Sequence, residues 1–180
     1  MIRKEAIMAR ASKKENKTVY QLRREELGLS RDKASELLEV IPPERIERIE
    51  SGKFTAHPDE VLVMAEKYGA PQLCNECCAH ECEIGKRYVT PIRMKDLSQI
   101  VLEMLASVNA AKRLQEELIE ITSDGVIQAD EMEDFVRIQD EVGKISVAAK
   151  TLQLWVEQKI AAGEIDEEAY KACREANSTQ

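Results

Sequence analysis

The sequence predicts an all-α protein, with helical regions on both sides of a short segment rich in cysteine. Of its 180 residues only 4% are aromatic and 33% are charged, and the chain has just seven glycines and five prolines. A composition rich in Ala, Leu, Glu, Lys and Arg is typical of helices rather than sheets. Apolar residues also recur at spacings of three and four, which places them on one face of a helix.

Three regions are expected along the chain. Residues 1–70 form a first helical domain with a basic N-terminal arm, residues 71–92 form a cysteine-rich connecting segment, and residues 93–180 form a second helical domain. Residues 1–24 hold eight basic and two acidic side chains, although the net charge of the whole chain is −8. A basic beginning suits a protein whose N-terminal part alone contacts a polyanion, while the alternative is a solvated lysine-rich tail.

The first two helices are predicted from apolar spacing and from the residues at their ends. Three apolar residues share one face of a helix that can end at Gly28: Val19, Leu22 and Leu27. The next helix is expected to begin after Ser30, because the serine hydroxyl can cap it. Its expected inward-facing residues are Ala34, Leu37 and Leu38.

The third helix can begin at the proline pair 42–43, because the first turn of a helix needs no amide donors. It is expected to bury Ile46 and Ile49 and to end at Gly52. A fourth helix should begin near Pro58 and end at Gly69. Its expected inward-facing residues are Val61, Leu62, Met64 and Ala65.

These four short helices over residues 18–69 resemble the helix-turn-helix domain of lambda-repressor/Cro-like (XRE-type) regulators. The residues at the family's characteristic positions are Leu22, Arg23, Leu29, Ser30, Ile46, Glu50, Gly52 and Pro58. Two features depart from the family pattern: Ala34-Ser35 replaces the usual Leu-Ala, and the turn before the third helix is one residue longer. The resemblance implies a domain whose third helix enters the major groove of DNA.

The resemblance also indicates which side chains would contact DNA. The candidates are Arg23, Arg31, Glu44, Arg45, Arg48 and Lys53. Arg45 and Arg48 would contact guanine or phosphate, and Arg31 would contact the backbone. Glu44 could accept a hydrogen bond from the amino group of cytosine. The alternative is a solvated surface on which Glu44 and Arg48, four residues apart, pair with each other.

Four of the five cysteines lie close together, and in a reducing cytosol such a cluster indicates metal or redox chemistry before structural disulfides. The candidate metal ligands are Cys74, Cys77, Cys78, His80 and Cys82. Their short spacings would let thiolates converge on zinc. An iron–sulfur cluster usually needs a more distant ligand, which Cys173 could supply. The alternatives are a disulfide switch and small buried side chains.

The C-terminal half predicts an amphipathic helix over 94–121, a longer helix over about 129–162 and a short final helix after Asp166. Apolar residues in the longer helix follow a heptad pattern: Phe135, Ile138, Val142, Ile145, Ala149, Leu152 and Val156. A helix about 50 Å long is too long for a small domain to cover. It is therefore expected to pack against residues 95–121 in an antiparallel hairpin and against a second chain.

Together these features predict a transcriptional regulator that binds double-stranded DNA as a cytoplasmic homodimer, with zinc, an iron–sulfur cluster or redox chemistry at the cysteines. The alternative is a helical protein-interaction or scaffold module that keeps the fold without binding DNA. An enzyme is not expected, because the chain has two histidines, no nucleophile–base signature and no phosphate loop. No apolar run approaches the roughly 18 residues of a membrane span, and the first residues lack an apolar signal core.

Overall fold

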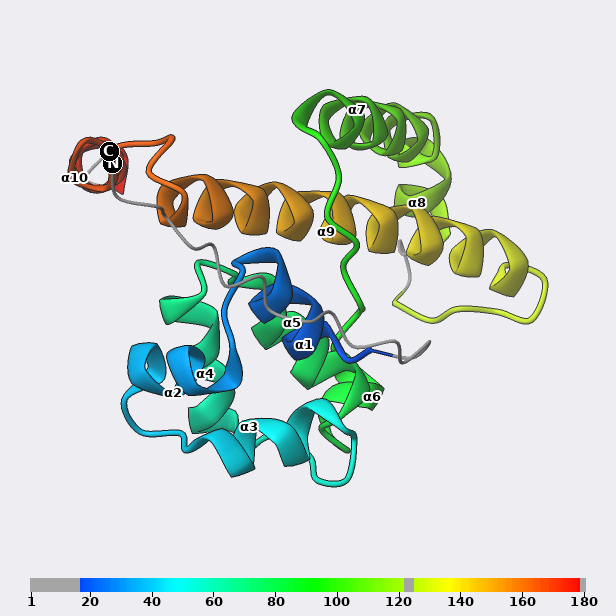
Figure 1. The fold of residues 1–180 in the computed structure, drawn as a ribbon. Coiled ribbons are helices and arrows are strands. Elements are labelled where there is room, and N and C mark those ends of the chain that lie inside the picture. The colour runs from blue at the N-terminus through cyan, green and yellow to red at the C-terminus, as the bar shows by residue number, and fades with distance from the viewer. Residues whose placement is uncertain (1–16, 122–124, 179–180) are drawn as a thin grey trace. The chain divides into compact units, whose positions relative to one another are not determined.

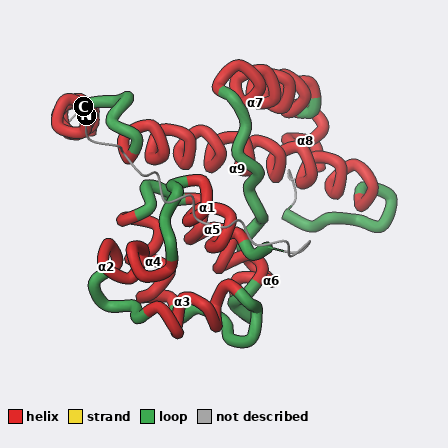
Figure 2. Tube along the Cα trace, viewed as in Figure 1, coloured by secondary structure: helices red, strands yellow, loops and turns green. Residues whose placement is uncertain are grey.

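The computed structural model describes residues 17–121 and 125–178 (Figure 1). Every regular element in these residues is a helix, so the predicted all-α class is confirmed (Figure 2). The basic arm predicted at the N-terminus lies outside the described residues, except for Lys17. The chain divides into two compact units, one of residues 1–91 with 161–164 and the other of residues 92–160 with 165–180. None of the described helices is both long and apolar enough to cross a membrane.

The first unit is built from short helices. They are α1 (Val19–Glu26), α2 (Arg31–Leu38), α3 (Pro43–Glu50), α4 (Pro58–Lys67), α5 (Gln72–His80) and α6 (Gly85–Tyr88). Their first turns are capped as the sequence suggests: Ser30 Oγ accepts a hydrogen bond from the amide of Lys33 at 3.2 Å, and Pro43 opens α3. The chain leaves α2 through Glu39, whose φ of 63° is rare for a residue other than glycine.

The core of this unit draws on α1 to α5. Its buried members are Tyr20, Ala34, Leu38, Ile41, Ile46, Ile49, Ala56, Val61, Met64, Ala65, Tyr68, Ala70, Leu73 and Cys77. Leu73 and Cys77 belong to α5, so the cysteine-rich segment contributes a helix to the same core as the four helices before it. Cys74, Cys77 and Cys78 are therefore held on a packed helix, and Cys82 lies just beyond its end.

Two leucines that were expected to face inward, Leu37 and Leu62, are exposed to 37% and 62%, so these predictions are wrong. Leu22 and Leu27, which were expected to share one apolar face, are also exposed, to 46% and 40%. A helix of eight to ten residues buries only a narrow stripe at spacings of three and four. In α4 that stripe runs through Val61 and Met64, and Leu62 is rotated about 100° away from Val61.

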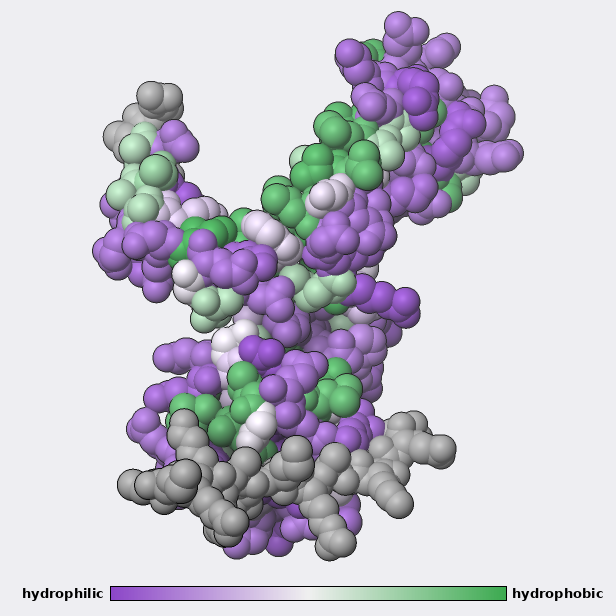
Figure 3. Space-filling view, turned by 45° about the horizontal axis from the view of Figure 1, so that its top comes forward, coloured by the Kyte–Doolittle hydropathy of each residue, from purple (hydrophilic) through white to green (hydrophobic). Residues whose placement is uncertain are grey.

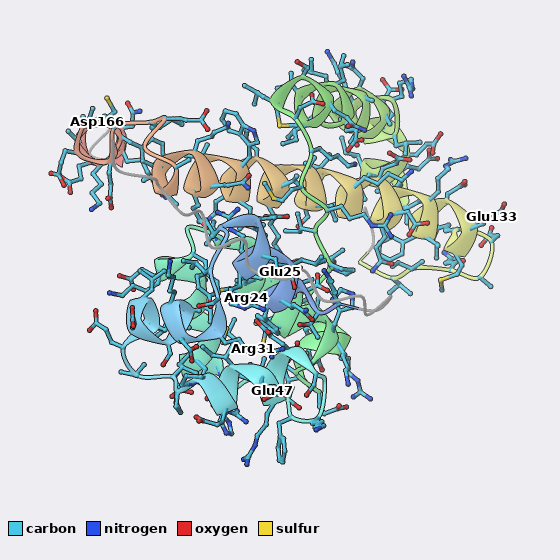
Figure 4. The ribbon with its side chains drawn as sticks, viewed as in Figure 1. Arg24, Glu25, Arg31, Glu47, Glu133 and Asp166 are labelled. Carbon is cyan, nitrogen blue, oxygen red and sulfur yellow. The ribbon has the colours of Figure 1, made fainter. Side chains whose placement is uncertain are left out.

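The second unit contains α7 (Leu97–Arg113), α8 (Gln115–Ile121), α9 (Met132–Ala161) and α10 (Glu167–Ser178). The single helix predicted over 94–121 is divided at Leu114, where the α-helical backbone of α7 stops. Glu117 of α8 pairs with Arg137 of α9 at 2.5 Å. Asp166 caps α10 as expected, since its carboxylate accepts a hydrogen bond from the amide of Ala169 at 2.7 Å (Figure 4).

Helix α9 has 30 residues and is about 45 Å long. Small residues of α7 and α9, such as Ala106 and Gly143, line a cavity of about 590 Å³ between the two helices. Much of the predicted heptad stripe reaches solvent, and Val142 is 52% exposed. Trp155, the only tryptophan of the chain, lies on α9 with the Lys159 ammonium 5.6 Å from the centroid of its ring. The space-filling view shows hydrophobic residues (green) at the surface among hydrophilic residues (purple) (Figure 3).

Candidate nucleic-acid interface

Helix α3 presents two different faces. Ile46, Ile49 and Glu50 are buried inside the first unit, whereas Glu44 and Arg48 are exposed to solvent. The exposed positions recur at spacings of three and four, so they lie on one side of the helix. The loop that follows α3 continues this exposed surface with Lys53 and Phe54. We call Glu44, Glu47, Arg48, Lys53 and Phe54 the α3 surface.

A buried ion-pair network holds α3 in place. Both carboxylate oxygens of Glu50 accept hydrogen bonds from Arg24, at 2.5 and 2.9 Å, and Arg31 Nε lies 2.9 Å from Glu50 Oε2. The exposed fractions of the Glu50 and Arg24 side chains are 1% and 7%. The hydrogen bond with Glu50 raises the pKa of Arg24 above its ordinary value. The network joins α1, α2 and α3, and Figure 4 labels Arg24 and Arg31 on the first two.

Three of the predicted DNA-contacting arginines bind groups within the first unit. Arg23 donates hydrogen bonds to the carbonyl oxygens of Tyr68 and Gly69, which end α4, with the shortest at 2.7 Å. Arg31 pairs with Glu50, as described above. Arg45 pairs through two nitrogens with the carboxylate of Glu60, at 2.7 and 2.6 Å.

The other three predicted contacts stay on the solvent side. Glu44, Arg48 and Lys53 are exposed, and the Arg48 guanidinium lies 5.6 Å from the centroid of the Phe54 ring. This distance is within the range of a cation–π interaction. Neither Arg24 nor Phe54 is indicated by a sequence pattern, and Glu50 is predicted only as a position typical of the lambda-repressor/Cro-like pattern. Glu50 could have been found, because it lies four residues after Ile46 and therefore on the buried face.

The Arg45–Glu60 pair gives the first unit an acid-dependent contribution to stability. Hydrogen bonding to Arg45 lowers the pKa of Glu60 below its ordinary value. A carboxylate with a depressed pKa stabilises the fold above its unfolded-state pKa, about 4.3 for glutamate, and this contribution is lost as the pH falls through the folded-state value.

We expect Glu60→Gln to lower the free energy of unfolding by about 1 kcal/mol at pH 7. The difference from the parent chain should shrink below about pH 4, because the parent carboxylate is then protonated as well. Urea denaturation at pH 7 and pH 3 measures both values. Glu66→Gln, an exposed change on the same helix, is the matched control. An equal effect of Glu60→Gln at both pH values would contradict the claim that the ionised carboxylate of Glu60 stabilises the fold by pairing with Arg45.

The cysteines of α5 and Cys82, which follows this helix, differ in their exposure to solvent. Cys77 is buried, and burial raises the pKa of its thiol. Cys78 and Cys82 are exposed, and Cys74 is partly buried. Adjacent residues of a helix are rotated about 100° from each other, which explains why Cys77 enters the core while Cys78 faces solvent.

The predicted metal ligands are not brought together. Among the described residues, no group of three or more His, Cys, Asp or Glu side chains is arranged to hold a metal ion. His80 is exposed beside Glu76, with Nδ1 3.2 Å from Oε1, and Cys173 is exposed on α10. The arrangement therefore does not fit zinc or an iron–sulfur cluster without movement of α5, and a metal centre stays a prediction. Elemental analysis of protein purified without oxygen measures whether zinc or iron is bound.

The chain approaches itself closely where α6 meets α5. A Cβ atom added to Gly85 would lie 1.8 Å from the carbonyl oxygen of Cys78. The amide of Gly85 also donates a hydrogen bond to Cys82 Sγ at 3.4 Å. A residue without a side chain is therefore required at position 85.

Comparisons with protein-family models, with curated proteins and with solved structures find no match to this chain.

Proposed function

We propose that the chain is a sequence-specific regulator that binds double-stranded DNA through the α3 surface. The observation that carries the proposal is the exposed α3 surface on a helix fixed from behind by the Arg24–Glu50–Arg31 network. A helix that reads bases needs a fixed orientation, because each base contact depends on the position of a side chain in the groove. Arg48 and Lys53 supply the positive charge of this surface, and Arg23, Arg31 and Arg45 act in positioning rather than in contact.

The test is the double variant Arg48→Ala with Lys53→Ala. We expect at least a tenfold loss of affinity for DNA selected from a random pool, with an unchanged fold because both side chains are exposed. A plot of the logarithm of affinity against the logarithm of salt concentration has a negative slope. The steepness of this slope should decrease by about 1–2, because up to two phosphate contacts are lost. Electrophoretic mobility shift or fluorescence anisotropy at several salt concentrations measures both quantities.

The control is Lys67→Ala, which removes an exposed lysine that pairs with Glu39 at 3.1 Å at the end of α4. This variant should keep the affinity and the salt slope of the parent chain. Equal DNA affinity of the double variant and the parent chain would eliminate α3 as the reading helix.

A second candidate function is a protein-interaction module that keeps the fold and does not bind DNA. The observation in its favour is that Glu44 and Glu47 are exposed on α3, while Arg31 and Arg45 are paired with carboxylates. Carboxylates near phosphate oppose binding through electrostatic repulsion. Absence of binding to any DNA in a random pool at low salt would favour this function.

We further propose that the second unit forms a homodimer. Its support is the number of large apolar side chains exposed in this unit: Leu97, Leu102, Leu105, Val108, Ile119, Val126, Met132, Val136 and Val142. Exposed apolar residues at helical spacing are typical of helix–helix interfaces. Sedimentation equilibrium measures the mass, and a monomer at micromolar concentration would contradict the dimer. A two-fold dimer would require two symmetric half-sites in the DNA.

A further inference from the structure

Phe54 is the apolar member of the α3 surface, and its side chain is 54% exposed. The other members of this surface are charged: Glu44, Glu47, Arg48 and Lys53. A phenyl ring carries no hydrogen-bond donor, so it cannot bind a phosphate oxygen as Arg48 and Lys53 can. What the ring offers a partner is apolar surface, which gains free energy when it is removed from water.

The loop that carries the ring is tied to α3 on both sides of Phe54. The backbone amides of Lys53 and Phe54 both donate hydrogen bonds to the carbonyl oxygen of Arg48, at 3.1 and 3.3 Å. On the other side, the Arg45 guanidinium donates to the carbonyl oxygen of Thr55 at 3.1 Å. The backbone at Phe54 therefore keeps a fixed place relative to the exposed face of α3.

The length of α3 keeps this loop close to the bases in the proposed complex. Helix α3 has eight residues and is about 12 Å long. The major groove of DNA is about 12 Å wide. A helix of this length fits inside the groove from its first turn to its last, so the residues that follow the last turn stay within reach of base edges.

The distance between Arg48 and Phe54 matches the spacing of neighbouring base pairs. The guanidinium carbon of Arg48 lies 5.6 Å from the centroid of the Phe54 ring. Successive base pairs are about 3.4 Å apart, so the two side chains can reach bases one or two pairs apart. Arginine pairs with O6 and N7 of guanine, and the apolar group that a base pair presents in the major groove is the C5 methyl of thymine.

We propose that Phe54 is a specificity-determining residue whose ring contacts the C5 methyl group of a thymine. This thymine lies one or two base pairs from the guanine that Arg48 binds, so each half-site contains both bases. The inference rests on the proposed function of the α3 surface and names part of the sequence that the surface reads. Because the contact is apolar, it adds discrimination between bases without adding to the salt dependence of binding.

The experiment starts from the DNA that the full parent chain selects from a random pool. Each thymine of the selected site is replaced in turn by deoxyuridine, which lacks only the C5 methyl group. We expect one thymine in each half-site at which this replacement weakens binding by the parent chain about fourfold, the effect of one buried methyl-sized group. Phe54→Ala should bind the thymine and uracil forms equally. Arg48→Ala should relax specificity at a guanine within two base pairs of this thymine.

Three further measurements separate a contact with the methyl group from a structural role of Phe54. Leu62→Ala removes another exposed apolar side chain, 62% exposed on α4 and outside the α3 surface, and should keep the fourfold difference. Phe54→Leu keeps an apolar side chain and should retain part of it. Phe54→Ala should leave the salt dependence of binding unchanged, unlike the Arg48 and Lys53 double variant. A structural role alone would weaken both DNA forms by the same factor.

The outcomes distinguish this proposal from the proposed function. Equal binding of the thymine and uracil forms by the parent chain at every position would overturn the role of Phe54 and leave DNA binding standing. The same is true of a fourfold difference that persists in Phe54→Ala. Absence of binding to any DNA in the pool would overturn both.

Discussion

Replacing Glu50 by alanine is expected to lower the free energy of unfolding of the first unit by about 3–5 kcal/mol. The change leaves the Arg24 guanidinium buried without a counter-charge and removes the group that joins α1, α2 and α3. Loss of one partner of a buried pair is far more damaging than loss of an exposed pair, because the remaining charge stays desolvated. Urea denaturation followed by circular dichroism measures the difference.

Glu47→Ala is the matched control for this prediction, because Glu47 lies on the same helix and is exposed (Figure 4). It should change the free energy of unfolding by no more than about 0.5 kcal/mol. A loss below about 1 kcal/mol in Glu50→Ala would mean that water reaches Arg24 when the carboxylate is removed. The network would then not be what fixes α3.

Replacing Gly85 by alanine is expected to lower the free energy of unfolding by about 2–3 kcal/mol. The added methyl group overlaps the carbonyl oxygen of Cys78, which is backbone and cannot rotate away. Helix α6 must therefore move off α5, and the hydrogen bond from the Gly85 amide to Cys82 Sγ would be lost. The higher helix propensity of alanine offsets only about 1 kcal/mol.

Gly143→Ala provides the contrast, because a Cβ atom at this helical position of α9 meets nothing within 4 Å. It should raise the free energy of unfolding of the second unit by about 0.5–1 kcal/mol through helix propensity alone. Thermal and urea denaturation of the two variants should give opposite signs. Destabilisation of similar size in both would show that glycine itself, and not the approach to Cys78, matters at position 85.

Local features of the fold could be predicted from sequence, whereas long-range pairs could not. Ser30 and Pro43 mark the beginnings of α2 and α3, because caps and proline act on the nearest turn. The pairing of Arg45 with Glu60 joins residues 15 positions apart on different helices, which no local pattern encodes. Nothing in the sequence at Leu114 marks the break between α7 and α8, since neither glycine nor proline lies there.

The candidate site was predictable to a similar degree. Arg48 and Lys53 were predicted as contacts, and both lie on the exposed side of the first unit. The network of Arg24 with Glu50 was missed, because buried charges are rare and a charged residue in sequence suggests a surface position. The different directions of Cys77 and Cys78 follow from helical rotation, but only once α5 is known to be a helix.

The single tryptophan has a spectroscopic consequence. Trp155 lies on α9 in the second unit. The aromatic residues of the first unit, among them Tyr20, Tyr68 and Phe54, are tyrosines and a phenylalanine. Fluorescence excited at 295 nm, where tyrosine absorbs little, therefore comes from Trp155 and reports on the second unit alone. Circular dichroism at 222 nm records the helices of both units. Comparison of the two signals during denaturation separates the melting of one unit from the melting of the other without any attached label.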